Sequence, residues 1–426
     1  MRVLLTTYPE KSFFQAMVPL AWALRTAGHD VRVASQPELV DTITQAGLTA
    51  VPVGRNRGIW RVAELDPDAR EASREGLPAP YNAVELGPEG VDWEAMRDGY
   101  RHHVRRWHRF DNFPMIEDLV SFARQWRPDL VLWEPTTYAG AIAAKACGAA
   151  HGRLLWSIDV FAVAREQYLR LDAERPAGQG EDPLGDWLAS YARKYGFEYG
   201  EDMITGQFTI DQLPDALRLE AGGLDYLPVR YVPYGGAASV PRWLWTAPER
   251  PRVALTLGIT ATNRFSGYVV GVQDVLDGLA DLDVEVVATI AASEQDKLGT
   301  VPDNVRVVSY VPLHALVPTC SAVIHHAGPG TLLTTALGAV PQVCVPWDFD
   351  EPELARRLAA QGSAETLLAS EATGPLVRER VERLFDEPSY RERALAMREE
   401  IRALPSPNAL VPALEELTVK HRAPGR

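Results

Sequence analysis

The sequence predicts an α/β protein with two domains, each built around a parallel, doubly wound sheet. Its 426 residues exceed the size at which a single core usually stops growing. Short apolar runs alternate with helical patterns from the first residues to about residue 160, and again from residue 252 onward. A stretch dense in Pro, Gly and Trp separates these two regions. Hydrophobic residues at 46% and charged residues at 23% are typical of a folded globular chain.

The first region begins with a βαβαβ pattern. Apolar, β-branched runs predict strands at residues 2–8, 31–35 and 48–53. Within residues 13–30 the apolar residues recur at helical spacing, which predicts a helix that ends near Gly28. The periodicity is lost over residues 54–90, which predicts long loops of the kind that often carry binding surfaces.

The parallel pattern then continues with a buried strand over residues 127–135, in which Glu134 falls where the strand should end. A helix of small residues from Tyr138 to Cys147 and a strand at 151–157 follow. The first region is therefore expected to be one α/β domain.

The second region contains five short apolar strands separated mostly by helices. The predicted strands are 252–258, 284–290, 304–311, 321–326 and 341–346, with a helix from about Ser266 to Ala280 after the first. We expect a first domain over 1–229, a linker over 230–251, a second domain over 252–404, and a segment at 405–426 that packs back toward the N-terminal domain.

Composition argues against several classes of protein. The 43 basic and 57 acidic side chains give a net charge of −14, the wrong sign for neutralising nucleic-acid phosphates. The three cysteines have no CxxC spacing, so neither a disulfide framework nor a structural zinc site is predicted. With no signal-peptide pattern and no apolar run of about 18 residues, we expect a cytoplasmic protein without a membrane span.

The strongest local signal for a binding site is HHAGPGT, residues 325–331, where a strand ends, a glycine turn follows and a helix begins. The unpaired N–H groups and the dipole of a helix N-terminus favour an anion there. His326 and Thr331 offer side-chain donors, and Gly258 with Thr260 follows the first strand of the same domain. The alternative is a tight turn without a ligand. A dinucleotide site is disfavoured because Leu333 breaks the GxGxxG pattern, and a Walker site because no Lys follows.

Acidic residues follow a strand shortly after this turn, in WDFDEPELARR. Asp348, Asp350 and Glu351 are ordinary residues for the start of a helix, but carboxylates beside an anion site would also accept hydrogen bonds from sugar hydroxyls. The Asp-x-Asp spacing also matches metal-dependent sugar transferases. We expect no metal, because helix amides already compensate phosphate charge.

Several motifs resemble known families. HHAGPGT, GAVPQVCVP and DFDEP resemble the nucleotide-sugar motif of the GT-B glycosyltransferases. Residues 1–54, RPDLVLWEPTTYAGA, TGQFTID, RYVPYGG and PRVALTLG resemble the actinobacterial deoxysugar transferases of macrolide and aromatic polyketide biosynthesis, of the desosaminyl and daunosaminyl transferase type. The resemblance is least clear over residues 55–110. It implies the GT-B fold, in which two Rossmann-like, doubly wound domains face a cleft, with 1–229 as the acceptor-binding domain and 252–404 as the nucleotide-sugar-binding domain.

The resemblance also implies a function, that of an inverting glycosyltransferase. It would move a deoxysugar from a dTDP-sugar, its co-substrate, to a hydrophobic polyketide aglycone, without a metal or another cofactor. By motif position, the diphosphate would meet His326, Gly328, Gly330 and Thr331, the base would meet Val311 and Leu313, and the sugar would meet Asp350 and Glu351.

The sequence departs from this family at the position of the general base. Relatives usually carry a His in the loop after the first strand, where this chain has Phe13 on the acceptor side. Glu134 matches the acidic residue that orients that His, and we expect it to face the cleft and to take the proton, with Glu10 as the second candidate. The family motif also more often has Gly and Gln where this chain has Ala327 and Glu351, and the extra carboxylate favours an aminodeoxysugar.

Three further expectations concern histidines, partners and the alternative function. His102, His103 and His108 are expected on a solvated face of a charged helix. The resemblance implies a cytochrome-P450-like activator protein, for which residues 92–126 are a candidate docking surface, and a homodimer is also expected. The alternative function is a catalytically silent GT-B protein that binds a nucleotide sugar or a partner, an alternative raised by Phe13.

Overall fold

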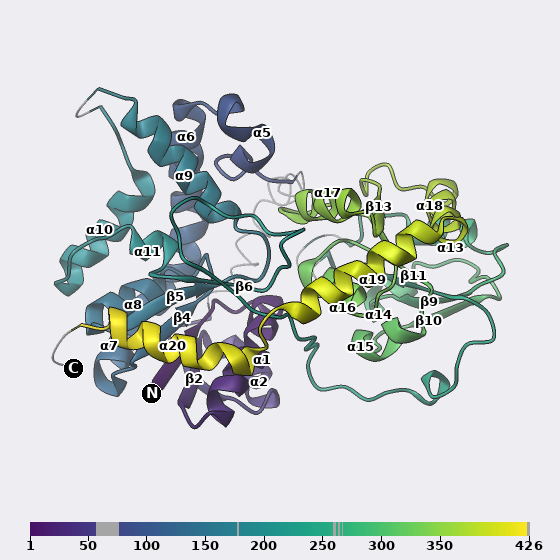
Figure 1. Cartoon of the computed structure of the whole chain (residues 1–426), viewed down its shortest axis with the longest axis horizontal. Helices are drawn as coiled ribbons and strands as arrows, with labels where there is room; N and C mark the ends of the chain where they lie inside the picture. The colour runs from purple at the N-terminus through teal and green to yellow at the C-terminus, as the bar shows by residue number, and fades with distance from the viewer. Residues whose placement is uncertain (57–75, 177–178, 259–260, 263–264, 266, 424–426) are drawn as a thin grey trace.

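A computed structural model describes the chain except for residues 57–75, 177–178, 259–260, 263–264, 266 and 424–426. Its described residues form two parallel sheets that lie at opposite ends of an elongated molecule (Figure 1). The first sheet has the strand order β3-β2-β1-β4-β5-β6-β7 and the second the order β10-β9-β8-β11-β12-β13. Both begin with the doubly wound order 3-2-1-4-5-6, so the predicted fold class is confirmed.

The first sheet has seven strands and helices on both of its faces. The strands are β1 (Arg2–Thr6), β2 (Asp30–Ser35), β3 (Thr49–Pro52), β4 (Leu130–Trp133), β5 (Ala150–Leu154), β6 (Thr209–Asp211) and β7 (Tyr226–Pro228). The helices are α1 (Lys11–Thr26), η1 (Pro37–Leu39), α2 (Val40–Gln45), α5 (Ala83–Gly90), α6 (Trp93–His103), η2 (Val104–His108), α7 (Arg109–Trp126), α8 (Ala139–Cys147), α9 (Val160–Ala173), α10 (Pro183–Tyr195) and α11 (Asp202–Thr205).

Successive side chains of β1 point to opposite faces of the sheet, which explains why its sequence is continuously apolar. Val3 and Leu5 join the core beneath α1, whereas Leu4 joins the core on the opposite face, beneath α7 and α8. A strand buried on both faces needs apolar residues at every position, which is why the run shows no polar alternation.

The second sheet follows the one-turn helix η3 (Arg242–Leu244). Its strands are β8 (Arg252–Thr256), β9 (Glu285–Thr289), β10 (Val305–Val308), β11 (Ala322–His325), β12 (Gln342–Cys344) and β13 (Ala364–Thr366). Its helices are α13 (Val272–Gly278), α14 (Ala292–Gln295), α15 (Leu313–Leu316), η4 (Val317–Thr319), α16 (Pro329–Leu337), α17 (Glu351–Gln361), α18 (Gly374–Asp386) and α19 (Pro388–Ala403).

The last helix, α20 (Pro407–His421), lies on the N-terminal sheet (Figure 1). Its buried residues Leu410, Val411 and Leu414 share a core with α1 and β5. The chain crosses between the two halves twice, and the crossings meet where the Arg230 N–H donates a hydrogen bond of 2.8 Å to the Pro405 carbonyl. The two halves are therefore joined by two adjacent connections.

Some elements differ from the sequence-based predictions. The strands β6, β7 and β13 were not predicted, because three residues are too few to show a period. A helix was predicted over 266–280, and the described residues of this range form α13, which begins at Val272. None of the described helices is both long and apolar enough to cross a membrane.

Candidate functional site

A cavity of about 1360 Å³ lies between the two sheets and is lined by both. Its wall includes Tyr8 after β1, Ser157 after β5, Gly258 after β8 and His326 after β11. Ligands of doubly wound sheets bind outside the carboxyl ends of the strands, and here two such edges face each other. The cavity is therefore the candidate site.

The turn after β11 is held by His325. The buried His325 ring accepts a hydrogen bond of 3.0 Å from the Ala327 N–H at Nδ1, and its Nε2 lies 2.6 Å from the Gln342 Oε1 atom. Burial lowers the pKa of His325 to about 3, so the ring is neutral and its Nε2–H can donate to Gln342. Ala327 adopts φ 69°, a conformation that costs an alanine about 1–2 kcal/mol and a glycine almost nothing. The alanine at this position is therefore strained as well as bulkier.

His326 faces the cavity between two glycines. A Cβ on Gly258 would lie 2.7 Å from the His326 Cε1 atom, and one on Gly328 would lie 2.3 Å from its Nε2, so neither position leaves room for a side chain. Burial lowers the pKa of His326 to about 4, which makes the ring a neutral hydrogen-bond donor rather than a cation. The glycines are thus needed for packing against the imidazole as well as for the turn.

The N-terminus of α16 opens onto the same cavity. Gly328 is the N-cap, and Gly328, Gly330 and Thr331 all line the wall. The Tyr231 hydroxyl donates a hydrogen bond of 3.1 Å to the Gly330 carbonyl and so ties the interdomain segment to this helix. First-turn N–H groups, the helix dipole and the adjacent His326 donor form an arrangement suited to a diphosphate.

Other residues that were predicted to bind the nucleotide sugar lie around this helix terminus. Val311 and Leu313 line the cavity, as does Gly258, whose φ of +70° suits a glycine. Thr260 falls outside the described residues.

An acidic loop borders the cavity beside His326. Asp348, Asp350 and Glu351 all line the wall. The Glu351 Oε2 atom accepts hydrogen bonds from the N–H groups of Trp347 and Asp348, at 3.3 and 3.1 Å, and its Oε1 lies 3.7 Å from the His326 Nε2.

The charges of these carboxyl groups depend on their burial. Burial raises the pKa of Asp350 to about 7, and burial together with Asp348 and Asp350 raises the pKa of Glu351 well above its usual range. The Asp350 Oδ2 atom is buried without a hydrogen-bond partner among the described residues. A sugar carrying hydroxyl or ammonium donors would satisfy that atom.

The structure places the candidate bases differently from the prediction. Glu134 is fully buried and does not line the cavity. Its carboxylate accepts hydrogen bonds from the N–H and hydroxyl of Thr136, each at 2.9 Å, and from the Thr137 hydroxyl. The expectation that Glu134 faces the cleft is therefore not met, because the loop after β4 folds over it.

Glu10 is also mostly buried. Its carboxylate caps α1 by accepting hydrogen bonds from the Ser12 N–H and hydroxyl, at 3.3 and 2.9 Å. Phe13, in contrast, does line the cavity, where it stacks on Trp156. An apolar aromatic surface thus lies where the family resemblance predicts a His.

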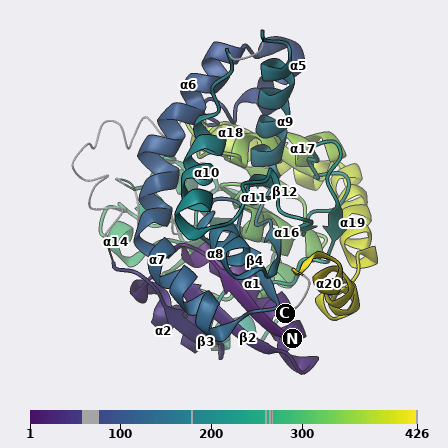
Figure 2. The ribbon, with the colours of Figure 1, turned by 90° about the vertical axis from the view of Figure 1, so that its left-hand side faces the viewer.

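The long helical segment from α6 through α7 forms part of the cavity wall, which the sequence did not indicate. Figure 2 shows α6 continuing into α7, and η2 between them is a π-helical turn. The expectation that His102, His103 and His108 share a solvated face is wrong for two of them. His103 and His108 are buried, and all three line the cavity. His103 and His108 pack against the ring of Tyr81, and π-helical turns such as η2 are often found at functional sites.

Tyr81 joins these histidines to the acidic loop. The Tyr81 hydroxyl lies 2.6 Å from the His108 Nε2 atom, and burial lowers the pKa of His108 to about 3, so the ring is neutral. On its other side, Tyr81 contacts the ring of Phe349 at 5.9 Å in an edge-to-face arrangement. Phe349 also approaches Phe161, so aromatic rings from both halves meet at the cavity.

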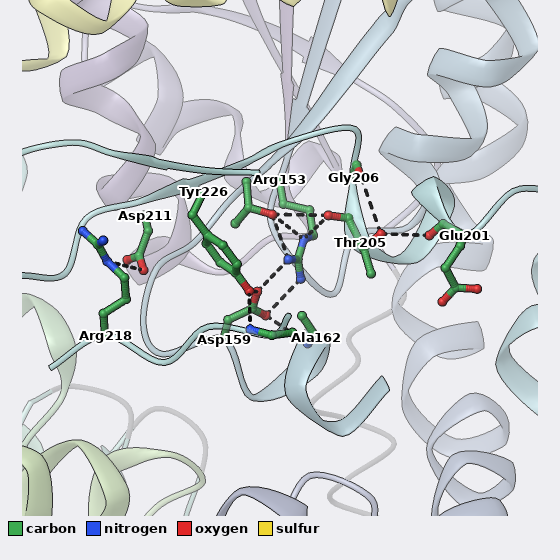
Figure 3. A network of polar contacts seen from close by, with 11 residues as sticks. Arg153, Asp159, Ala162, Glu201, Thr205, Gly206, Asp211, Arg218 and Tyr226 are labelled. Carbon is green, nitrogen blue, oxygen red and sulfur yellow. Dashed lines mark hydrogen bonds and ion pairs between the residues drawn. The ribbon is translucent and has the colours of Figure 1, made fainter. Parts of the chain in front are cut away.

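A buried polar network supports the N-terminal wall (Figure 3). The Arg153 guanidinium donates two hydrogen bonds, of 2.9 and 2.6 Å, to the two carboxylate oxygens of Asp159, and the Tyr226 hydroxyl donates a third, of 2.8 Å. Beside it, Arg218 pairs at 3.4 Å with Asp211, which lines the cavity. The network ties β5, β7 and the start of α9 together behind the wall.

Chemically, the site combines a helix N-terminus suited to an anion and acidic groups on one side with aromatic rings on the other. Within the described residues, no group of three or more His, Cys, Asp or Glu side chains is arranged to hold a metal ion.

Comparison with known proteins identifies relatives over the whole chain. Residues 22–258 match the family described as erythromycin biosynthesis protein CIII-like, N-terminal domain, and residues 273–417 match the C-terminal domain of the same description. The chain is 45% identical to the 10-deoxymethynolide desosaminyltransferase of Streptomyces venezuelae, over 100% of this chain and 99% of the relative. It is 42% identical to the TDP-daunosamine transferase DnrS of Streptomyces peucetius, over 100% of this chain and 98% of the relative.

Solved structures show the same similarity. The glycosyltransferase VinC in complex with dTDP superposes with a TM-score of 0.86 at 38% identity, over 99% of this chain and 100% of that one. The spinosyn forosaminyltransferase SpnP superposes with a TM-score of 0.82 at 38% identity, over 98% and 99% of the two chains. The predicted GT-B fold and the resemblance to deoxysugar transferases are confirmed.

Proposed function

The chain belongs to the erythromycin biosynthesis protein CIII-like family of glycosyltransferases, and we propose that it moves an aminodeoxysugar from a dTDP-sugar to a hydroxyl of a polyketide-type aglycone. The observation that carries this proposal is one continuous cavity with an anion-binding helix terminus and acidic loop on one side and aromatic rings on the other. Such a cavity suits a charged donor and an apolar acceptor bound face to face.

The donor half follows from the C-terminal domain. The diphosphate would bind the first turn of α16 and the His326 imidazole, with Gly328, Gly330 and Thr331 at contact distance. Val311 and Leu313 would contact the thymine base, and Asp350 and Glu351 the sugar. The bound dTDP of VinC supports this assignment, as do the desosaminyl and daunosamine transferases among the relatives.

The acceptor half follows from the N-terminal domain. Phe13, Trp156, Phe161 and Tyr81 form an apolar wall suited to a polyketide ring system. The reaction is a direct displacement with inversion. The acceptor oxygen bonds to the anomeric carbon as its O–H bond breaks, and the bond from that carbon to the diphosphate oxygen breaks with its electron pair leaving on dTDP. We propose that helix amides and His326 stabilise this leaving group, with the dTDP-sugar as co-substrate and no further cofactor.

The assignment of the general base to Glu134, with Glu10 second, stays a prediction from the sequence. Because Glu134 is covered by Thr136 and Thr137, it would act through those hydroxyls rather than by contact with the acceptor.

Partners and location are also proposals. An activator protein would dock on residues 92–126, where Arg105, Arg106 and Trp107 are exposed. A homodimer is proposed on the resemblance alone. The three cysteines are free thiols, which fits the cytoplasm.

Titration with a panel of dTDP- and UDP-sugars, followed by transfer assays on polyketide aglycones with and without an activator protein, tests the proposal. We expect dTDP to bind more tightly than UDP and a dTDP-aminodeoxysugar to be transferred. Tight binding without transfer under either condition would instead favour the alternative, a catalytically silent protein, for which Phe13 in the base position is the supporting observation.

A further inference from the structure

Transfer to a hydroxyl needs a proton acceptor that touches the acceptor oxygen, and neither Phe13 nor the covered Glu134 meets that need. We propose that Asp111 is the carboxylate that takes this proton. The inference rests on the proposed transferase function and adds a catalytic residue to it.

Asp111 lies in the first turn of α7, directly after the π-helical turn η2. It lines the cavity although the residue is only 8% exposed. Among the described residues, none donates a hydrogen bond to its carboxylate oxygens. This carboxylate is therefore buried, open to the cavity and not engaged elsewhere.

Contacts to two strand ends hold this part of α7 in place. The Gln36 side chain, after β2, donates a hydrogen bond of 3.5 Å to the Asp111 carbonyl. Asn112 donates one of 2.8 Å to the Thr136 carbonyl after β4, and accepts one of 2.7 Å from the Ala139 N–H. Asp111 is thus fixed at the carboxyl edge of the sheet, the edge that also carries Phe13.

The electrostatic environment suits a general base. Burial and the negative charge of Glu134 raise the pKa of Asp111 to about 8. A base is most effective when its pKa lies near the working pH, because it then combines a usable deprotonated fraction with affinity for the proton. Other titratable groups on the elements packed here are Glu10 and Lys11 at the start of α1 and the neutral His108 on the preceding turn.

This arrangement gives Glu134 a different role from the predicted one. Its buried charge raises the affinity of Asp111 for a proton, which makes Glu134 a positioning and tuning residue rather than the group that contacts the acceptor. In the transfer step, the acceptor O–H proton passes to an Asp111 carboxylate oxygen as the bond to the anomeric carbon forms.

The test compares Asp111→Asn with Asp41→Asn, a matched control that removes an exposed carboxylate from the first turn of α2, away from the cavity wall. We expect Asp111→Asn to lower kcat by about a hundredfold or more, with dTDP affinity by calorimetry and the melting temperature near those of the wild type. Asp41→Asn should keep wild-type kcat. Asp111→Glu should recover part of the activity, because it restores a carboxylate.

The pH profile provides a second readout. Wild-type kcat should rise with pH through the pKa of Asp111, because the deprotonated form is the base. Glu134→Gln removes the neighbouring negative charge, so the rise in kcat should move to lower pH. If Asp111 had only a structural role, the pH at which kcat rises would be the same in the wild type and in Glu134→Gln.

Two outcomes would overturn the inference. One is a wild-type enzyme that transfers sugar together with an Asp111→Asn variant that keeps kcat within about threefold, against the hundredfold loss expected of a missing base. The other is a Glu134→Gln variant that loses turnover at every pH while Asp111→Asn does not. A wild-type chain that binds dTDP but transfers nothing in any assay would instead contradict the proposed function.

Discussion

Phe13 stacks on Trp156 with ring centroids 4.1 Å apart and ring planes 11° from parallel. Tyr8 closes the group by approaching Phe13 edge-on at 5.5 Å. Phe13, at the position where the resemblance predicts a His, is thus part of an aromatic wall of the cavity.

This stacking predicts an effect on the acceptor. Phe13→Ala removes an aromatic contact worth about 0.5–1.5 kcal/mol beyond the buried area, so KM for an aglycone should rise several-fold to about tenfold. Affinity for dTDP should stay unchanged, because Phe13 lies on the opposite half of the cavity. Steady-state kinetics and calorimetry measure the two effects. Phe385→Ala, on α18 in the C-terminal domain, is the control, and an equal rise in KM there would contradict the assignment.

Binding of dTDP should depend on pH through the groups around the diphosphate. The pKa of His326 is lowered to about 4 and that of Asp350 is raised to about 7, both chiefly by burial. A bound diphosphate favours protonation of both groups, so its affinity should increase as the pH falls from about 8 to 6, with uptake of protons. Calorimetry in buffers of different ionisation enthalpy measures that uptake.

Substitutions at His326 and Asp350 separate the two contributions. His326→Ala should weaken dTDP binding by more than about tenfold, because a charge-assisted hydrogen bond contributes ~1.5–3 kcal/mol. Asp350→Asn should remove most of the pH dependence near neutrality and leave dTDP affinity high. Unaltered dTDP affinity in His326→Ala would remove His326 from the diphosphate site.

Glu351 should select for an aminodeoxysugar. An ammonium near Asp350 and Glu351 would stabilise their ionised forms, which burial disfavours. Glu351→Gln should therefore lower kcat/KM for amino donors more than for neutral deoxysugar donors, which serve as the control within the same variant. Equal kcat/KM for the two donor classes in the wild type, unchanged in the variant, would show that Glu351 does not select the sugar.

The ion pair behind the wall should dominate the stability of the N-terminal domain. Asp159→Ala would leave the fully buried Arg153 uncompensated, at a cost of about 3–5 kcal/mol in the free energy of unfolding. Urea denaturation measures the loss. Glu174→Ala, which breaks the exposed pair with Arg170, should cost less than about 0.5 kcal/mol. Similar losses in the two variants would mean that water reaches Arg153.

Much of the fold was predictable because its signals are local. The apolar runs of β1, β4, β8 and β11 and the glycines after β11 are readable within a few residues, and together they predict two doubly wound sheets with an anion site at the start of α16. The three-residue strands β6, β7 and β13 carry no such signal, since their pairing partners and not their own periods define them.

What the tertiary structure decided is which side chains reach the cavity and in what charge state. Position in the sequence suggested that Glu134 faces the cleft and that His103 and His108 face water. Packing reversed both, because a two-threonine loop covers Glu134 and both histidines pack against the ring of Tyr81. In the sequence, nothing distinguishes Asp111 from the other charged residues of its helix. Burial and the approach of Glu134, 23 residues away along the chain, change its protonation, and such long-range proximity is a property of the folded chain alone.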